Sequence, residues 1–468
     1  MQSFIKINGL KAGFVFLFVF LFINNIFGQA TCDAVPNEIL LRIANASDLP
    51  AIASQYGLNS TPLGQVGTPP IYRMQITGGQ TPCQVASAMQ GDARIVEREV
   101  NRKLNSVERE GLVWTQGRSW SVGRSWSVGG SVKGFNSQYF PNLIHLNEAH
   151  NLSTGKGVII AVLDTGIDLN HPLFAGRLVP GYDFVDNDSD PSEVGVPHTD
   201  AAYGHGTHVA GIIATVAPDA KIMPIRMLDK NGESDLWKFK DAMIFAAQHG
   251  AQVMNVSFAY PRDLTSQSNS FIACLFNVNR GLGGCTSIPG LNDAQVTVVM
   301  AAGNGGMIGN GAERVFPAAE RGYVFEHGGD DNGKDFIMTV GASTRFDELA
   351  PFSTMANVVN RRQDRWVRAV APGEDIISAI PGGRYGAWSG TSMAAPIGSG
   401  IAALVLQVRP LNKNRPIENV IEEIEETGYE WECQVSSRNI FMETARIDAY
   451  RAVMNIQTNT PVQPACLP

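Results

Sequence analysis

The feature that most constrains this chain is a fully apolar run that leads straight into an acid. Residues 157–163 read GVIIAVL and are followed by Asp164. A strand that is apolar on both faces is typical of a parallel sheet covered by helices on both sides. Ligands and chemistry collect at the carboxyl ends of such strands. We therefore expect an α/β fold with Asp164 just beyond the end of a central strand.

Strands and helices alternate further along the chain. After the apolar run 222–228 comes a segment from Asp235 to Gln248 with its apolar residues on one helical face. Gly250 follows as a stop signal, and residues 251–256 predict the next strand. This βα alternation indicates a doubly wound, mainly parallel sheet flanked by helices.

Two further polar residues open apolar helices. His205 begins the segment HGTHVAGII, and Ser392 lies in Gly390-Thr391-Ser392-Met393 ahead of another apolar run. A serine at this point can simply cap the helix. The free N–H groups and positive dipole end of a helix also favour an oxyanion, which a serine generates when it attacks a carbonyl.

These element ends carry the groups that nucleophilic catalysis requires. Ser392 is expected to be the nucleophile, His205 the general base and Asp164 the group that holds the imidazole tautomer. Asn304 follows another apolar run, 296–302, and its amide can donate to the oxyanion beside the backbone N–H of Ser392. Taken alone, the segment after that run would be an ordinary turn.

His208 offers a second interpretation, in which it forms a zinc pair with His205. Zinc hydrolases more often place two histidines four residues apart on one helical face. His208 also stands among Thr207, Val209 and Ala210. We therefore expect a packed, hydrogen-bonded helix histidine.

The motifs DTGID, GHGTHVAG, AAGN and GTSMAAP, in that order, resemble those of the subtilisin-like serine proteases, the subtilase family. The resemblance covers roughly residues 137–455. It implies a subtilisin-like serine endopeptidase that acts on proteins or peptides and needs no cofactor for its chemistry. By the same resemblance the catalytic residues are Asp164, His205 and Ser392, with Asn304 in the oxyanion hole.

The chain also departs from the family pattern. Ser257-Phe258-Ala259-Tyr260 stands where many members have Ser-Leu-Gly-Gly beside the substrate cleft, so the usual preference for large apolar residues is not carried over. Residues 214–218 follow the helix of His205 without an inserted loop, so the family's common strong calcium site is expected to be missing.

An acidic loop precedes His205. It reads DFVDNDSDP over residues 183–191, and carboxylates at this density suit calcium. Some thermostable subtilases have a similar loop that binds calcium, and the matching positions are Asp183, Asp188 and Asp190. The alternative is a solvated acidic turn.

The first residues have the form of a secretory signal peptide, with a basic start, an apolar block over 14–23 and small residues at Gly28 and Ala30. Asn24 and Asn25 cut the block short of the roughly 20 residues that a membrane anchor needs. We expect a secreted protein, extracellular or periplasmic, that has no membrane attachment once the signal is removed. The net charge of −8 and the lack of a basic run argue against binding to nucleic acid.

Six cysteines fit an oxidising compartment. They allow fifteen pairings. Pairing within each neighbourhood of the sequence predicts Cys32–Cys83, Cys274–Cys285 and Cys433–Cys466.

Residues 34–105 form a separate α+β unit. Strands at 38–43, 71–76 and 93–100 alternate with a helix that starts at residues 47–50 and a helix over 81–90, a ferredoxin-like pattern. The resemblance implies a propeptide that assists folding and acts as an intramolecular inhibitor. An unrelated N-terminal module is the alternative.

A tandem repeat of GRSWSV follows, over residues 117–128, and is expected to be an exposed linker where maturation cleavage is tolerated. We expect the cut between about residues 105 and 135. The predicted domain order is signal peptide 1–28, propeptide 29–110, linker 111–136, catalytic domain 137–455 and C-terminal tail 456–468.

Overall fold

The computed structural model describes residues 32–106, 114–115, 118–119, 126–197, 199–261, 296–306, 315–316, 337–355, 367, 369–411, 418–435 and 440–457. The predicted signal peptide, most of the C-terminal tail, and Cys274, Cys285 and Cys466 lie outside these residues.

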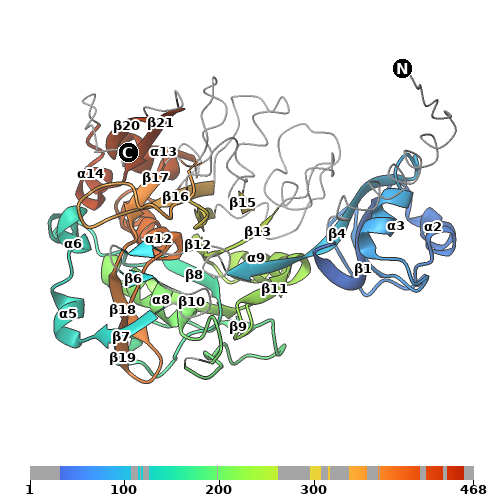
Figure 1. Cartoon of the computed structure of the whole chain (residues 1–468), viewed down its shortest axis with the longest axis horizontal. Coiled ribbons are helices and arrows are strands. Elements are labelled where there is room, and N and C mark those ends of the chain that lie inside the picture. Colours follow the sequence, from blue (N-terminus) through green and yellow to red (C-terminus); the bar gives the residue numbers. More distant parts are fainter. Residues whose placement is uncertain are drawn as a thin grey trace, which may run out of the picture.

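The larger part of the chain is built on a mainly parallel sheet, as predicted (Figure 1). In order of pairing its strands are β20 (Tyr429–Val435), β21 (Ile440–Arg446), β17 (Ala369–Pro372), β16 (Ile337–Ser343), β14 (Thr297–Ala301), β12 (Val253–Val256), β8 (Ile159–Asp164), β10 (Lys221–Arg226) and β9 (Tyr182–Asp183). Neighbours are parallel except β20 and β21, which form an antiparallel pair.

Helices cover both faces of this sheet, because side chains point alternately to either side of a strand. On β8, Ile160 and Val162 belong to one apolar core together with α8 (His205–Val216) and α12 (Thr391–Val408). Ala161 and Leu163 belong to the core on the opposite face, with α9 (Leu236–Gln248). The result is a three-layer α/β domain.

Helix α12 is the centre of the first core. Among the described helices it is the one long and apolar enough to cross a membrane by length and composition, yet 89% of its apolar window is buried inside the protein. It packs closely on α8, because a Cβ at Gly400 would lie 2.5 Å from Val216 Cβ. Glycine at this position therefore lets the two helices that begin with His205 and Thr391 lie side by side.

Shorter elements surround the sheet. They are α5 (Val132–Asn136), α6 (Phe140–Leu143), α7 (Leu146–His150), η2 (Pro172–Phe174), α13 (Glu418–Glu426), α14 (Ala449–Met454), and the short strands β5 (Trp114–Thr115), β6 (Arg118–Ser119) and β15 (Val315–Phe316). A separate antiparallel sheet joins β18 (Ile376–Ile380), β19 (Arg384–Trp388) and β7 (Trp126–Gly130). The first three residues of β7, 126–128, are the last three of the repeat, so the end of the predicted linker pairs with β19.

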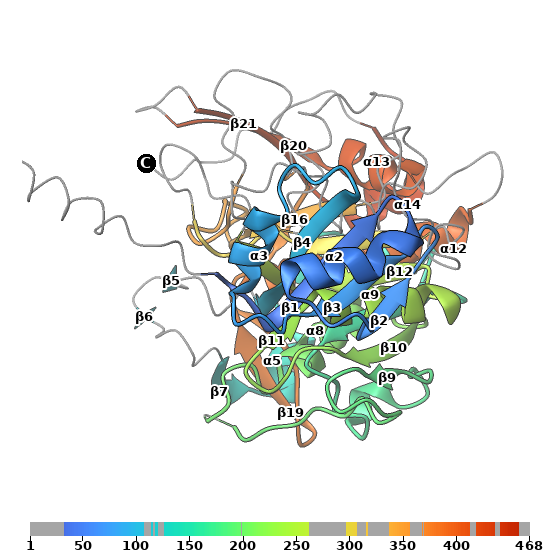
Figure 2. The same ribbon diagram turned by 90° about the vertical axis from the view of Figure 1, so that its right-hand side faces the viewer.

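The N-terminal unit forms a lobe beside the main body, as the two views show (Figures 1 and 2). Its elements are β1 (Ala34–Ile43), η1 (Ala46–Asp48), α2 (Leu49–Tyr56), β2 (Gly64–Val66), β3 (Ile71–Gln75), α3 (Pro82–Ala88) and β4 (Ile95–Ser106). The strands pair antiparallel in the order β4, β1, β3, β2. Ile39, Ile52 and Val85 are among the residues of a core that belongs to this lobe alone.

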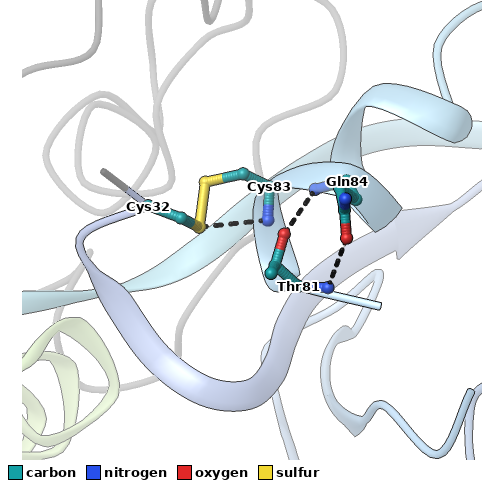
Figure 3. Close-up of a disulfide and its surroundings, with 4 residues drawn as sticks. All are labelled: Cys32, Thr81, Cys83 and Gln84. Atoms are coloured by element: carbon teal, nitrogen blue, oxygen red, sulfur yellow. Dashed lines mark hydrogen bonds between the residues drawn. A yellow bond between two sulfur atoms is a disulfide. The ribbon is translucent and has the colours of Figure 1, made fainter. Parts of the chain in front are cut away.

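A disulfide ties the start of the lobe to α3 (Figure 3). Cys32 and Cys83 are bonded, which confirms the first of the predicted pairs. Cys83 lies in the first turn of α3, where Thr81 and Gln84 form a reciprocal capping box. The other two predicted pairs include residues outside the described part of the chain.

Strand β4 is longer than the sequence indicated, and it leaves the lobe. Its last residues pair antiparallel with β11 (Glu233–Asp235) on one side and with β13 (Phe258–Pro261) on the other. The lobe is therefore joined to the main body by a continuous strand, as Figure 1 shows at β4 and β11. The alternation of apolar and polar residues predicted the strand. It did not predict the extension, because the extension pairs with strands more than a hundred residues further along the chain.

Candidate active site

The candidate site lies at the carboxyl edge of three neighbouring strands. Asp164 is the last residue of β8, Ser257 follows β12, and Asn304 comes shortly after β14. Because these strands are adjacent and parallel, their ends lie at the same edge. Asp164 and Ser257 are fully buried, and Asn304 is 4% exposed.

Asp164 and His205 form a direct hydrogen bond. The Nδ1–H of His205 donates to Asp164 Oδ1 at 2.7 Å, and both side chains are 1% exposed. The backbone N–H of Thr165 donates to the same oxygen at 2.8 Å. The carboxylate is therefore held by its own turn and is aimed at the imidazole.

Gly206 permits this contact. A Cβ at residue 206 would lie 2.2 Å from the carbonyl oxygen of Gly166 and 3.1 Å from Asp164 Cβ. The N–H of Gly206 donates to Thr165 Oγ1 at 2.9 Å. The glycine that follows His205 thus lets the first turn of α8 rest directly on the loop after β8.

Ser392 lies in the first turn of α12 and is fully buried. Its Oγ is 3.5 Å from the carbonyl oxygen of Ser257, which is at the limit of a hydrogen bond. The hydrogen bond between the Ser392 hydroxyl and this carbonyl is therefore weak at most. Helix α12 packs against α8, against β8, which ends at Asp164, and against β14, which precedes Asn304. The elements that carry or precede the predicted residues therefore meet in one region.

The amide of Asn304 has a defined orientation. Its Oδ1 accepts from the backbone N–H of Thr391 at 2.9 Å and from Thr391 Oγ1 at 3.0 Å. The N–H of Gly303 in turn donates to Thr391 Oγ1 at 3.0 Å. Because the oxygen accepts both of these bonds, the two ends of the amide are distinguished and the nitrogen is its donor end. Position 304 is an ordered part of the site, not a plain turn.

His208 is the packed helix histidine that the sequence predicted. It is fully buried, and its Nε2 lies 3.1 Å from the carbonyl oxygens of both Ile376 and Gly386. A nitrogen that donates to carbonyls carries a proton and is not a metal ligand. Burial lowers the pKa of His208 to about 3, so the side chain is neutral. These contacts favour the packed helix histidine over the zinc-pair interpretation.

Sequence reasoning missed two supports of the site. The ring of Trp388, 2% exposed, lies edge-on to His205 with the ring centroids 5.3 Å apart. Asn255 links Ser399 of α12, at 2.9 Å, to Ser257, at 3.1 Å. Trp388 stands two residues before the GTSMAAP motif, and Asn255 two before Ser257. The closeness of Trp388 and Asn255 to these segments is the sequence signal that could have identified them.

The carboxylates of the acidic loop have hydrogen-bond partners within the protein. Asp183 Oδ1 accepts from the N–H groups of Val185 and Asp186, and its other oxygen pairs with Arg226. The carboxylates at 188 and 190 accept N–H groups of their own loop.

Within the described ranges, no group of three or more His, Cys, Asp or Glu is placed to hold a metal. A guanidinium therefore supplies the positive charge here, and calcium at Asp183, Asp188 and Asp190 stays a prediction that these side-chain positions do not support.

The end of β4 lies against the same region. Ser106 pairs with Phe258, Asn105 with Ala259 and Glu233, and Leu104 with Ser234. The N–H of Ser106 also donates to the Gly232 carbonyl at 2.8 Å.

The N-terminal lobe therefore adds an extended strand between two strands of the main body, next to Ser257. The Phe258 ring, 1% exposed, packs edge-on to Phe239 of α9 with the ring centroids 4.8 Å apart.

Comparison with known proteins gives a consistent result. Residues 155–432 match the sequence model of the subtilase family. A thermophilic serine proteinase of Bacillus sp. (strain AK1) is 35% identical over 327 residues, which are 68% of this chain and 67% of that protein. Thermitase of Thermoactinomyces vulgaris is 32% identical over 333 residues, 68% of this chain and 95% of that protein.

Among solved structures, fervidolysin of Fervidobacterium pennivorans, described as a keratinolytic enzyme related to subtilisin, superposes with a TM-score of 0.62. The sequence identity is 21%, and the match covers 92% of this chain and 63% of that one. At this identity the likeness concerns the fold alone. It extends over the N-terminal lobe as well as the main body, because it covers most of the chain.

Proposed function

Because this chain belongs to the subtilase family of serine proteases, we propose that it is a secreted, self-processing zymogen that hydrolyses peptide bonds through an acyl-enzyme on Ser392. The observation that carries the residue assignment is the buried 2.7 Å hydrogen bond between Asp164 and His205, at the edge of the sheet where Ser392 also lies. A serine protease needs a general base whose imidazole is held in orientation by a second group, and the Asp164–His205 pair provides this.

In the proposed reaction, His205 Nε2 removes the proton from Ser392 Oγ as the oxygen attacks the scissile carbonyl. The carboxylate of Asp164 fixes the tautomer with the proton on Nδ1 and stabilises the imidazolium that forms. His205 then gives its proton to the leaving amine, and water releases the acyl group by the same steps. No metal or cofactor takes part in these steps.

The oxyanion is proposed to lie between the amide nitrogen of Asn304 and the backbone N–H of Ser392. The second group is one of the N–H groups in the first turn of α12 that have no acceptor within the helix. The contacts from Thr391 to Asn304 Oδ1 support this role, because they use the amide oxygen as an acceptor and fix the orientation of the amide. Such fixed donors stabilise charge that develops in the transition state.

A serine-directed phosphonate tests the residue assignment. The purified protein is expected to be labelled at a single serine, and peptide mapping should find the label on Ser392. A chain in which Ser392 is replaced by alanine should remain unlabelled, whereas one with Ser399 replaced should still react. Failure of the wild-type chain to react, with the fold intact, would remove the proposed activity.

Secretion is supported by two features of the chain. The first 28 residues have the pattern of a cleavable signal, and the Cys32–Cys83 disulfide belongs in an oxidising compartment. The two lie close together in the sequence. We therefore propose that the bond forms after the leader has crossed the membrane.

The N-terminal lobe is proposed to act as the propeptide and intramolecular inhibitor. Its strand β4 lies between β11 and β13 as a peptide substrate would lie, with main-chain pairing on both sides. Leu104 is fully buried and belongs to a core of the main body that includes Leu236 and Phe258. The lobe thus fills the places that a substrate needs.

The register of β4 also narrows the position of the maturation cut. Ser106 pairs with Phe258, so continuing the antiparallel register by one residue would bring position 107 opposite Ser257. The Ser257 carbonyl is the group 3.5 Å from Ser392 Oγ. We therefore propose that the first cut falls between positions 107 and 108, near the start of the range that the sequence allowed.

N-terminal sequencing of the mature protein should begin at residue 108. Leu104→Ala is expected to slow the first cut by about tenfold or more, because it removes buried apolar contacts worth roughly 2–5 kcal/mol. Lys103→Ala on the exposed face of the same strand is the matched control and should process normally. A first N-terminus well inside the repeat, with Leu104→Ala processed at the wild-type rate, would contradict the proposed register.

A further inference from the structure

A second carboxylate lies beside the Asp164–His205 pair, and the proposed reaction does not use it. Glu193 belongs to the segment after the acidic loop, and its backbone is fixed against the loop after β8. The N–H of Ile167 donates to the Pro191 carbonyl, and the N–H of Glu193 donates to the Ile167 carbonyl, both at 3.1 Å. The backbone of residues 191–193 therefore runs directly beside the turn that follows Asp164.

The Glu193 side chain caps the helix that carries His205. Gly204, at the N-cap of α8, provides no side chain to accept the first N–H groups. Glu193 Oε2 accepts instead from the Thr207 N–H at 3.2 Å and from Thr207 Oγ1 at 2.9 Å. Thr207 Oγ1 also accepts from the Asp168 N–H at 3.0 Å. A remote carboxylate thus joins the first turn of α8 to the loop after β8.

Opposing effects act on the charge of this carboxyl group. The helix N-terminus and the hydroxyls of Thr165 and Thr207 favour the ionised form. Burial disfavours it most strongly, and the charge of Asp164 disfavours it further, so the pKa of Glu193 is raised to about 7.

Tyr203 lies near Glu193, and its own pKa is raised by burial and by Glu193. His205 lies two residues before Thr207, which Glu193 Oε2 contacts, and Thr207 also contacts the N–H of Asp168. Arg384 of β19 acts on Tyr203 in the opposite direction.

We propose that Glu193 is a positioning residue that holds the first turn of α8, and with it His205, and that its charge adjusts the proton affinity of the catalytic histidine. The proposal rests on the roles given above to Asp164, His205 and Ser392. An ionised Glu193 stabilises the imidazolium form of His205, so the base becomes harder to deprotonate.

The pH profile of kcat/KM tests the electrostatic part. Glu193→Gln keeps an oxygen that can accept from Thr207 but removes the charge. We expect the midpoint of the acid limb to move to lower pH by on the order of half a unit. Glu148→Gln, the same change on the exposed face of α7, should leave the midpoint in place. Superimposable profiles for wild type and Glu193→Gln would overturn the proposal.

Glu193→Ala tests the positioning part, because it removes the acceptor as well as the charge. We expect kcat to fall at every pH in Glu193→Ala and to be restored near its plateau in Glu193→Gln. If both variants lose activity equally across the pH range, Glu193 only supports the fold and the proposal fails.

A stability measurement separates this proposal from the function on which it rests. In the Ser392→Ala background, Glu193 can be followed without catalysis. Its pKa is higher in the folded than in the unfolded chain, so folding stability falls as pH rises from about 4.5 to 7. Glu193→Gln lacks this loss, and its Tm relative to the parent should rise over the same range by roughly 2–4 °C.

A flat difference in Tm would show that Glu193 does not titrate there and would overturn the inference, whatever the catalytic result. An unreactive wild-type chain that still shows the Tm difference would remove the proposed function but leave the coupled carboxyl group.

Discussion

Replacing Ser392 by alanine is expected to lower kcat/KM for peptide hydrolysis by on the order of 10⁶-fold, the scale of nucleophile removal in related serine proteases. The covalent pathway is lost with the hydroxyl, whereas the oxyanion donors and the bound substrate strand remain. The same variant should not process itself, so the purified protein should keep residues 29–107. Activity and intact mass measure the two effects in one preparation.

The fold should survive this substitution. Ser392 Oγ makes only the 3.5 Å contact with Ser257 among the bonds that the structure gives it, so Tm should stay close to that of the wild type. Ser399→Ala is the matched control, because Ser399 lies on the same helix and hydrogen-bonds Asn255. It should keep most of the activity. Hydrolysis at the wild-type rate by Ser392→Ala would refute the assignment of the nucleophile.

Asp164→Asn is expected to lower kcat/KM by about 10⁴-fold at neutral pH. Asp164 Oδ1 accepts from both the Thr165 N–H and His205 Nδ1. An amide that keeps one of these contacts cannot stabilise the imidazolium, and its N–H₂ group favours the wrong tautomer of His205. The loss should appear mainly in kcat, because the Asp164 carboxylate acts on the imidazole during the reaction, whereas substrate is proposed to bind by main-chain pairing with β11 and β13.

Asp168 provides the control, since it belongs to the same DTGID motif. Its carboxylate accepts from the backbone N–H groups of Asn170 and Gly382, whereas the hydrogen bond to His205 Nδ1 comes from Asp164. Asp168→Asn should therefore stay within about tenfold of the wild type, as expected for a changed surface turn. Equal losses in the two variants would show that loop structure, and not orientation of the imidazole, sets the rate.

The sheet and its helices could be predicted because the signal for them is local. The apolar run before Asp164 became β8, and the segment that begins at His205 became α8, within a few residues of the expected bounds. The placement of polar residues at the ends of these elements could be predicted as well, since neighbouring parallel strands have their carboxyl ends at the same edge of the sheet. His208 was also predicted correctly, because its apolar neighbours indicated burial.

What the sequence could not predict depends on partners far along the chain. Arg226 pairs with Asp183 from 43 positions away, and no residue pattern in the acidic loop predicts this ion pair. The orientation of the Asn304 amide depends on Thr391, and the helix cap of α8 depends on Glu193, which lies in a polar segment without any periodicity. In each case two local patterns are correct, and the contact between them is a property of the tertiary structure.

The extension of β4 into the main body has a consequence for what the mature protein can digest. If the lobe is released as proposed, β11 and β13 lose the backbone partner that β4 provides between them, and an extended polypeptide is the conformation that can pair with both strands at once. A helix or a compact loop in a protein substrate would have to unfold over several residues before it could bind between β11 and β13. Unfolded proteins and flexible termini should therefore be hydrolysed faster than well-folded proteins.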